Sequence, residues 1–119
     1  MPKPTTNHFD YLEFPAATVE ALIHTKGFYA SVFGWTYQDW GDDYADTKDS
    51  GLASGITADQ AHRPKHPLAV IYTDDLEAAR ARVIEAGGTV TKDIFPFPGG
   101  RRFHFTDPTG NELAVWSDR

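Results

Sequence analysis

The chain has 119 residues, enough for one domain with a hydrophobic core and too few for two independent domains. It contains no cysteine, which excludes a disulfide framework and a thiolate metal site. The net charge of −6 argues against a nucleic-acid partner, and no apolar run approaches the roughly 20 residues of a membrane helix. We therefore expect a cytoplasmic protein without a signal peptide and without a membrane partner.

The first half of the chain predicts one strand, one helix and three short strands. Side chains alternate from His8 to Phe14, which indicates a strand that ends at Pro15. Thr18 is suited to cap a helix that runs to about Phe33, where Gly34 follows. Glycine- and aspartate-rich turns then separate three predicted strands, over residues 35–40, 44–47 and 51–57.

Apolar residues recur at near-helical spacing in this segment, which supports the predicted helix. They are Val19, Leu22, Ile23, Tyr29, Val32 and Phe33.

The second half repeats this order after a polar linker at residues 58–65. An apolar strand is predicted over residues 67–72. Asp74, with Glu77 three residues later, indicates a capping-box-like start of a helix that ends near Ala86, before two glycines. A strand over residues 89–94, a rigid aromatic loop over 95–100 and a hairpin over 99–116 complete this half.

The hairpin near the C-terminus has a well-defined predicted turn. Asp107, Pro108 and Gly110 occupy the first, second and fourth positions, where a type I turn favours these residue types. Apolar residues alternate on both sides of the turn, at Phe103 and Phe105 before it and at Leu113 and Val115 after it. The stretch therefore predicts two short strands joined by a tight connection.

The repeated order predicts an α+β protein. The same offset, 57 residues, separates Tyr11 from Leu68 and Thr18 from Asp75. We expect a single domain over residues 1–119, with one βαβββ module at about 7–57 and another at about 66–117. The mixed sheets of the two modules are expected to curl around a shared cleft, with the helices outside. A ferredoxin-like βαββαβ domain has too few strands to use every segment.

Three stretches resemble the vicinal oxygen chelate superfamily of glyoxalases, bleomycin-resistance proteins and extradiol dioxygenases. They are the strand-DPxGN-strand hairpin at the C-terminus, FYASVFGW at residues 28–35 and YTDDLEAARARVIEAGG at residues 72–88. The resemblance covers nearly the whole chain and implies the two-module fold described above.

The resemblance also implies where a divalent metal would bind. Its metal-dependent members hold the ion with His and Glu from the first and last strands of the two modules, and these positions fall on Tyr11, Leu68 and Ala114. None of these residues is a good metal ligand, so we predict no metal and no other cofactor. A divalent metal bound by displaced ligands, His66 and Glu112, is the alternative, because a two-residue step stays on the same face of a strand.

Strand alternation predicts the residues that line the cleft. They are Phe9, Tyr11, Glu13, Leu68, Val70, Glu112, Ala114 and Trp116. This aromatic and aliphatic wall with two carboxylates suits a flat or partly cationic organic molecule. Glu13 is the candidate catalytic residue, because a buried carboxylate needs a partner or a ligand and can act as a proton shuttle. Simple packing between the two sheets is the alternative explanation.

Three functions follow from these observations. The first is a metal-independent protein that binds a small organic molecule and forms a homodimer, as bleomycin-resistance proteins do. The second is a glyoxalase-like lyase, isomerase or dioxygenase with displaced metal ligands, and the third is a regulatory or binding subunit with a vestigial cleft. The fold alone does not choose among them.

Overall fold

The computed structural model describes residues 4–119, which form eight strands and two helices. The chain divides into two units. The first unit is Tyr11–Leu68, and the second unit joins the first ten residues to Ala69–Arg119. Within the described residues, neither helix has the length and apolar character needed to cross a bilayer.

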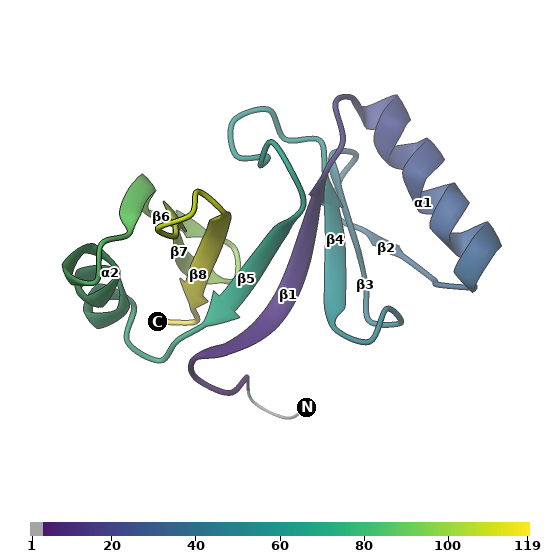
Figure 1. Ribbon diagram of the computed structural model, residues 1–119. Helices are drawn as coiled ribbons and strands as arrows, with labels where there is room; N and C mark the ends of the chain where they lie inside the picture. The colour runs from purple at the N-terminus through teal and green to yellow at the C-terminus, as the bar shows by residue number, and fades with distance from the viewer. Residues whose placement is uncertain (1–3) are drawn as a thin grey trace. The chain divides into compact units, whose positions relative to one another are not determined.

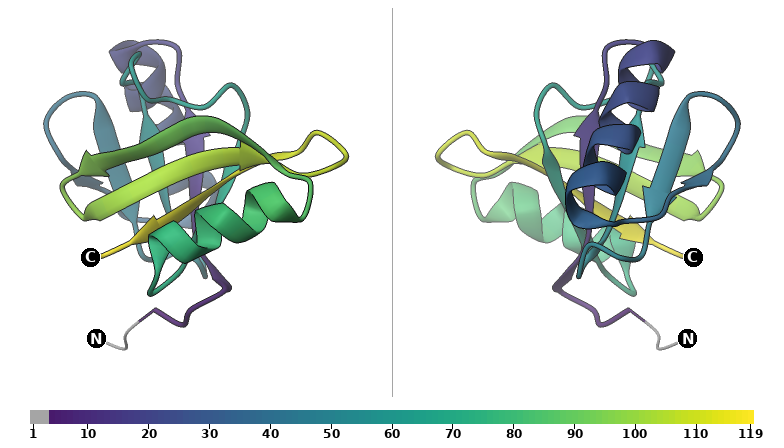
Figure 2. Two further views of the ribbon diagram at one scale, coloured as in Figure 1. Left: turned by 90° about the vertical axis from the view of Figure 1, so that its left-hand side faces the viewer. Right: turned by 90° about the vertical axis from the view of Figure 1, so that its right-hand side faces the viewer.

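The first unit is a four-stranded sheet with one helix (Figure 1). Its strands lie in the order β1-β4-β3-β2, in which β1 and β4 are parallel and the other neighbours are antiparallel. The helix α1 covers one face of this sheet (Figure 2). The elements are β1 (His8–Pro15), α1 (Val19–Phe33), β2 (Gln38–Asp39), β3 (Tyr44–Thr47) and β4 (Ala53–Thr57).

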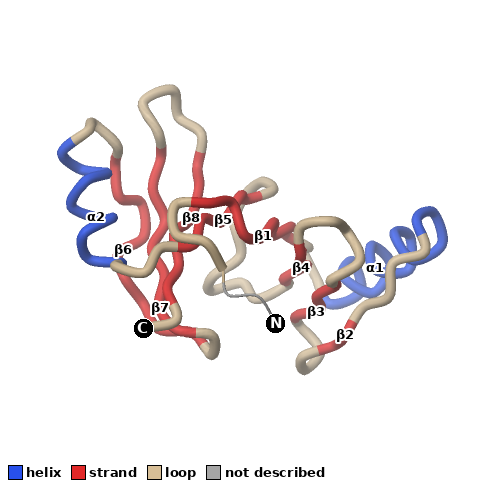
Figure 3. The backbone as a smooth tube through the Cα atoms, turned by 90° about the horizontal axis from the view of Figure 1, so that it is seen from below, coloured by secondary structure: helices blue, strands red, loops and turns tan. Residues whose placement is uncertain are grey.

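The second unit has the same topology. Its strands lie in the order β5-β8-β7-β6, again with one parallel pair, β5 and β8, followed by antiparallel neighbours. The helix α2 lies beside β6 and β7 (Figure 3). The predicted α+β class and the repeated strand-helix-three-strand order are confirmed. The elements are β5 (Leu68–Tyr72), α2 (Leu76–Glu85), β6 (Thr89–Phe97), β7 (Gly100–Thr106) and β8 (Glu112–Ser117). That the two units share a cleft stays a prediction.

Each helix buries the alternate side chains of its own sheet. In the first unit Phe14 and Ile56 pack with Leu22 of α1, and in the second unit Phe103 and Val115 pack with Leu76 of α2. Because successive strand residues point to opposite faces, the other face of each sheet carries a different set of residues. We call this second surface the helix-free face.

The apolar residues of α1 do not all face the core. Leu22 is 2% exposed, but Val19, Ile23, Val32 and Phe33 are exposed, the last by 58%. The sheet contacts only one stripe of the helix, and Ile23 and Val32 lie to either side of it. Phe33 is the last residue of the helix, where its ring stacks against Tyr29 and Trp35 with centroids 6.3 and 5.3 Å apart. The predicted caps are confirmed: the Thr18 side chain accepts a hydrogen bond from the amide of Ala21 at 3.0 Å, and Gly34 adopts the left-handed conformation with φ 75°.

Two boundaries in the second unit differ from the prediction. The N-cap of α2 is Asp75, whose carboxylate accepts from the amide of Ala78 at 3.1 Å, whereas Asp74 bonds with Thr6. The aromatic segment that we expected to be a loop belongs to β6, which continues to Phe97. Pro96 is tolerated there because β6 is the outermost strand of its unit, where one edge needs no donor.

Candidate functional site

The helix-free face of the first unit is organised around Gly55. Gly55 of β4 pairs with Glu13 on β1 and with Asp46 on β3, so that a carboxylate lies on each side of it. Tyr11 and Tyr44 reach over the glycine from these same strands, and their hydroxyl groups are hydrogen-bonded to each other. A Cβ atom at position 55 would lie 2.5 Å from the Tyr44 hydroxyl and closer still to that of Tyr11. The absence of a side chain on β4 therefore makes room for the phenol pair.

Burial and the neighbouring groups keep Tyr11 neutral. Burial is the largest cause that raises the pKa of Tyr11 above its usual value of 10, followed by Tyr44 and by the carboxylates of Asp46 and Glu13. A neutral phenol has one proton to donate and two lone pairs to accept with. The pair is therefore a fixed hydrogen-bonding group at neutral pH, without a phenolate charge on Tyr11.

Glu13, the candidate catalytic residue, is 5% exposed on the same face as Tyr11. It already has an interaction partner within the protein. Its burial is therefore explained without a ligand, and its catalytic role stays a prediction. The structure adds Tyr44 and Asp46 as neighbours that sequence patterns alone did not bring together with Glu13.

The helix-free face of the second unit is aromatic and cationic. Trp116 contacts Tyr72 and Phe97 edge-on, with ring centroids 5.1 and 6.1 Å apart, and its indole nitrogen donates to the Asp10 carboxylate at 2.9 Å. The guanidinium of Arg102 lies 5.8 Å from the centre of the Phe97 ring. Lys92, which pairs with His104, lies 5.9 Å from the centre of the Phe95 ring, so this surface offers planar groups for stacking and the positive charges of Arg102 and Lys92.

Arg102 also determines the protonation of His104, which is 2% exposed. Two nitrogens of the guanidinium lie 3.2 and 3.0 Å from Nε2 of His104. A guanidinium only donates hydrogen bonds, so Nε2 must be the acceptor. His104 is therefore a neutral imidazole with its proton on Nδ1 while it is bonded to Arg102.

The eight predicted cleft residues divide between the units. Tyr11, Glu13 and Leu68 belong to the first unit, and the other five belong to the second. In the register of β5 and β8, Val70 and Ala114 are direct neighbours, and that these eight residues line a cleft stays a prediction. Phe9 is 58% exposed. The second-unit members are Phe9, Val70, Glu112, Ala114 and Trp116.

Metal-dependent members also take a ligand from the last strand of the first module, and the sequence did not place this fourth position. The structural repeat does. Ala114 of β8 pairs with Val70, and Gly55 of β4 pairs with Glu13, the residue that lies 57 positions before Val70. Gly55 is therefore the counterpart of Ala114. An isolated glycine inside a predicted strand was the sequence signal for a close approach at this point.

The residues at the four family metal positions do not fit a divalent cation. Gly55 and Ala114 offer no donor atom, Leu68 is apolar, and the Tyr11 hydroxyl is a neutral phenol already bonded to Tyr44. A metal bound in the usual way would need a different set of side chains at these positions.

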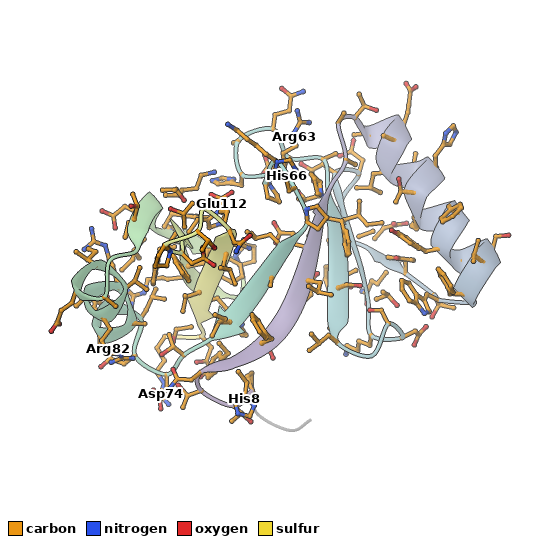
Figure 4. All side chains as sticks on the ribbon, viewed as in Figure 1. His8, Arg63, His66, Asp74, Arg82 and Glu112 are labelled. Atoms are coloured by element: carbon orange, nitrogen blue, oxygen red, sulfur yellow. The ribbon has the colours of Figure 1, made fainter. Side chains whose placement is uncertain are left out.

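The displaced ligands of the alternative prediction lie in different units (Figure 4). His66 is exposed in the loop before β5, and Glu112 begins β8, where it accepts a hydrogen bond from Thr91 at 2.8 Å. From residue 4 to residue 119, no three His, Cys, Asp or Glu side chains are grouped as metal ligands.

Comparison with known proteins identifies the family. Residues 8–115 match the model of the glyoxalase/bleomycin resistance protein/dioxygenase superfamily. The chain belongs to this superfamily, and membership supports a small-molecule-binding, glyoxalase-like protein. It is similar to the CFP32 protein of Mycobacterium tuberculosis, with 30% identity over 102 residues, and to the anthracycline biosynthesis protein DnrV of Streptomyces peucetius, with 33% identity over 110 residues.

These relatives are longer proteins. The matches cover 76% and 75% of this chain but only 39% of CFP32 and 40% of DnrV, so the chain spans about two fifths of their length. The fold is also that of the Mn(II)-bound glyoxalase from Novosphingobium aromaticivorans, with a TM-score of 0.66 and 23% identity. That match covers 95% of this chain and 39% of the other.

Proposed function

We propose that this protein binds a small organic molecule without a divalent metal. The observation that carries the proposal is the phenol pair over Gly55, which occupies the region where metal-dependent members of the superfamily have ligands. Tyr11 itself takes the place of a ligand and is held neutral by burial. The first unit therefore presents hydrogen-bonding groups of its own in place of a Lewis acid.

The charges around the phenol pair favour a particular ligand chemistry. Glu13 and Asp46 flank Gly55 from opposite sides, and the two phenols lie between them. Carboxylates accept hydrogen bonds and attract positive charge, while a phenol ring provides a flat surface. We propose a ligand with hydroxyl, amide or ammonium donors on a flat frame.

Metal analysis is the first test of this function. Elemental analysis and native mass spectrometry of protein purified without a His tag should find no stoichiometric metal. Adding Fe(II), Mn(II), Ni(II) or Zn(II), or removing metal with EDTA, should leave the melting temperature unchanged. One tightly bound ion per chain would contradict the proposal and direct attention to His66 and Glu112.

Glu13→Gln tests the ligand-binding role. In a screen of flat cationic compounds, this variant should bind a hit about 10- to 100-fold more weakly, the range expected for a lost charge-assisted hydrogen bond. Glu20→Gln, in the exposed first turn of α1, removes the same charge away from the site and should bind normally. Equal binding by the Glu13 variant would remove this residue from the site.

A metal-dependent enzyme is the second candidate, favoured by the Mn(II)-bound glyoxalase of the same fold. In that case Glu13 would act as the proton shuttle of a lyase, isomerase or dioxygenase reaction. The third candidate, a regulatory subunit with a vestigial cleft, predicts neither metal nor ligand. A homodimer and a cytoplasmic location remain parts of the proposal.

A further inference from the structure

A second pocket lies in the second unit, on the side of the sheet that α2 covers. Its volume is about 360 Å³, which is within the range of small-molecule sites. Apolar side chains from the helix, from β5 and from β7 line it, among them Val83, Ile71 and Phe105. The residues over Gly55 belong to the first unit, and none of them lines this pocket, so the pocket is independent of the function proposed above.

The pocket exists because α2 presents small side chains to the sheet. Ala79 and Ala86 line it from the helix, and both lack the volume to fill the space in front of Phe105 and Val115. The helix is also short, ten residues, and ends at Glu85. Leu76 and Phe103 therefore pack in the core of this unit, while the pocket stays unfilled by side chains.

Arg82 supplies the positive charge of the pocket. It lies in the last turn of α2 and is exposed at the rim (Figure 4). Two other arginines of this unit, neither of which lines the pocket, are paired: Arg80 with Asp93 at 2.8 Å and Arg101 with Glu77. Arg82 forms no ion pair with any residue from 4 to 119.

The carboxylate of Asp107, the acidic residue of the lining, already accepts hydrogen bonds from its own turn. The Asp107 carboxylate, whose pKa the Asn111 side chain lowers to about 2, accepts hydrogen bonds from Thr109 and Asn111 on both of its oxygens. The negative charge of Asp107 repels an anion near this turn, so an anionic group in the pocket would bind at Arg82 instead. Thr73, which is 2% exposed, also lines the pocket, and its hydroxyl is bonded to the backbone of Asp75 at 3.3 Å.

We propose that this pocket binds a small amphipathic carboxylate. The carboxylate pairs with the guanidinium of Arg82, which suits planar two-oxygen groups. The apolar body packs against Ile71, Val83 and Phe105 and removes their surface from water.

Amide chemical shifts measured during titration with sodium octanoate test this inference. We expect saturable shifts at Thr73, Val83 and Phe105, and binding by Arg82→Gln that is at least tenfold weaker. Arg80→Gln, which changes a paired arginine on the same helix, should bind octanoate like the unchanged protein. 1-Octanol, which has the same chain without the charge, should bind more weakly than octanoate and be insensitive to Arg82→Gln.

A second pair of variants tests the pocket itself. Ala86→Phe fills the space from the exposed end of the helix and should abolish the octanoate shifts, whereas Ala81→Phe, exposed but outside the lining, should not. Both variants should keep the circular dichroism spectrum of the folded protein. The inference is overturned if octanoate produces no shifts at the lining amides, if Arg82→Gln and Arg80→Gln lose affinity equally, or if Ala86→Phe binds normally.

Discussion

Gly55 has only a hydrogen atom as its side chain, so large side chains of the neighbouring strands can lie directly above it. Tyr11 and Tyr44 come from strands on either side of β4, and their hydroxyls meet over that atom. In metal-dependent members of the superfamily the resemblance implies a metal ligand on this strand. Here the same space holds two aromatic rings that bring their own hydrogen-bonding groups.

Gly55→Ala should lower the free energy of unfolding by about 1–3 kcal/mol, the usual cost of overpacking. The added methyl group would overlap both hydroxyls and force the phenols apart. Urea unfolding measures this change. Gly27→Ala, where nothing lies within 4 Å of an added Cβ, is the matched control. A Gly55→Ala protein as stable as the unchanged one would contradict the packing described here.

Tyr11 should make the stability depend on alkaline pH. Its pKa is raised in the folded protein, chiefly by burial, whereas the unfolded chain titrates near 10. Above pH 10 the unfolded chain therefore binds fewer protons than the folded one, and stability falls as pH rises. Urea unfolding at pH 9, 10 and 11 should show this loss, with a smaller slope in Tyr11→Phe. Identical slopes would show that Tyr11 titrates normally. The raised pKa values of Tyr37 and Tyr72 account for the slope that remains in the variant.

At the scale of the element, α1 contains two glycines with opposite requirements. Gly27 lies in the exposed middle of the helix, and Gly34 ends it with φ 75°. Gly27→Ala should raise the free energy of unfolding by about 0.5–1 kcal/mol, because alanine loses less conformational freedom in a helix. Gly34→Ala should lower it by about 1–2 kcal/mol through left-handed strain. Thermal unfolding of both variants checks the difference in sign.

The turn between β7 and β8 is held by an ionised carboxylate. The Asn111 side chain is the largest cause of the low pKa of Asp107, about 2, and the amide of Thr109 adds to it. Because this pKa is below the unfolded value of 3.8, the stability that it contributes is present above pH 4 and is lost between about pH 4 and 2. In a carbon-13 titration, Asn111→Ala should move the pKa of Asp107 toward 3.8. An unchanged value would assign the shift to the backbone amides and the Thr109 hydroxyl.

Several elements could be predicted from the sequence because their signals are local. Thr18, Gly34 and the Asp107 turn have the side-chain chemistry that caps and turns require, and each lies where it was expected. The start of α2 was misplaced by one residue because Asp74 and Asp75 are chemically alike, and only the bond with Ala78 distinguishes them. The phenol pair could not be predicted, because it depends on the register of three strands.

At the scale of the whole molecule, the twofold repeat was visible in the sequence because both halves have the same order of elements. The offset of 57 residues also places equivalent positions on β1 and β5. The exposure of the apolar residues of α1 was not visible, since helical spacing does not report how wide the covering sheet is.

The predicted homodimer is testable at this scale. Sedimentation equilibrium at micromolar concentration should give twice the chain mass of 13.2 kDa. Ile23, Phe28 and Phe33 of α1 are exposed by 52–59%, and burying such surface would favour association. A single species of 13.2 kDa across the concentration range would refute the dimer.

The glycine under the phenol pair also restricts how this protein could change by mutation. A Glu at position 55 would supply a metal ligand of a type that the resemblance implies for metal-dependent relatives, but its Cβ has no room while Tyr11 and Tyr44 are present. The tyrosines would have to be replaced first, and their loss removes the hydrogen bond that they share. The same substitution is thus harmful in one background and permitted in another. This sign epistasis makes the acquisition of a metal ligand at position 55 a multi-step route with an unfavourable first step.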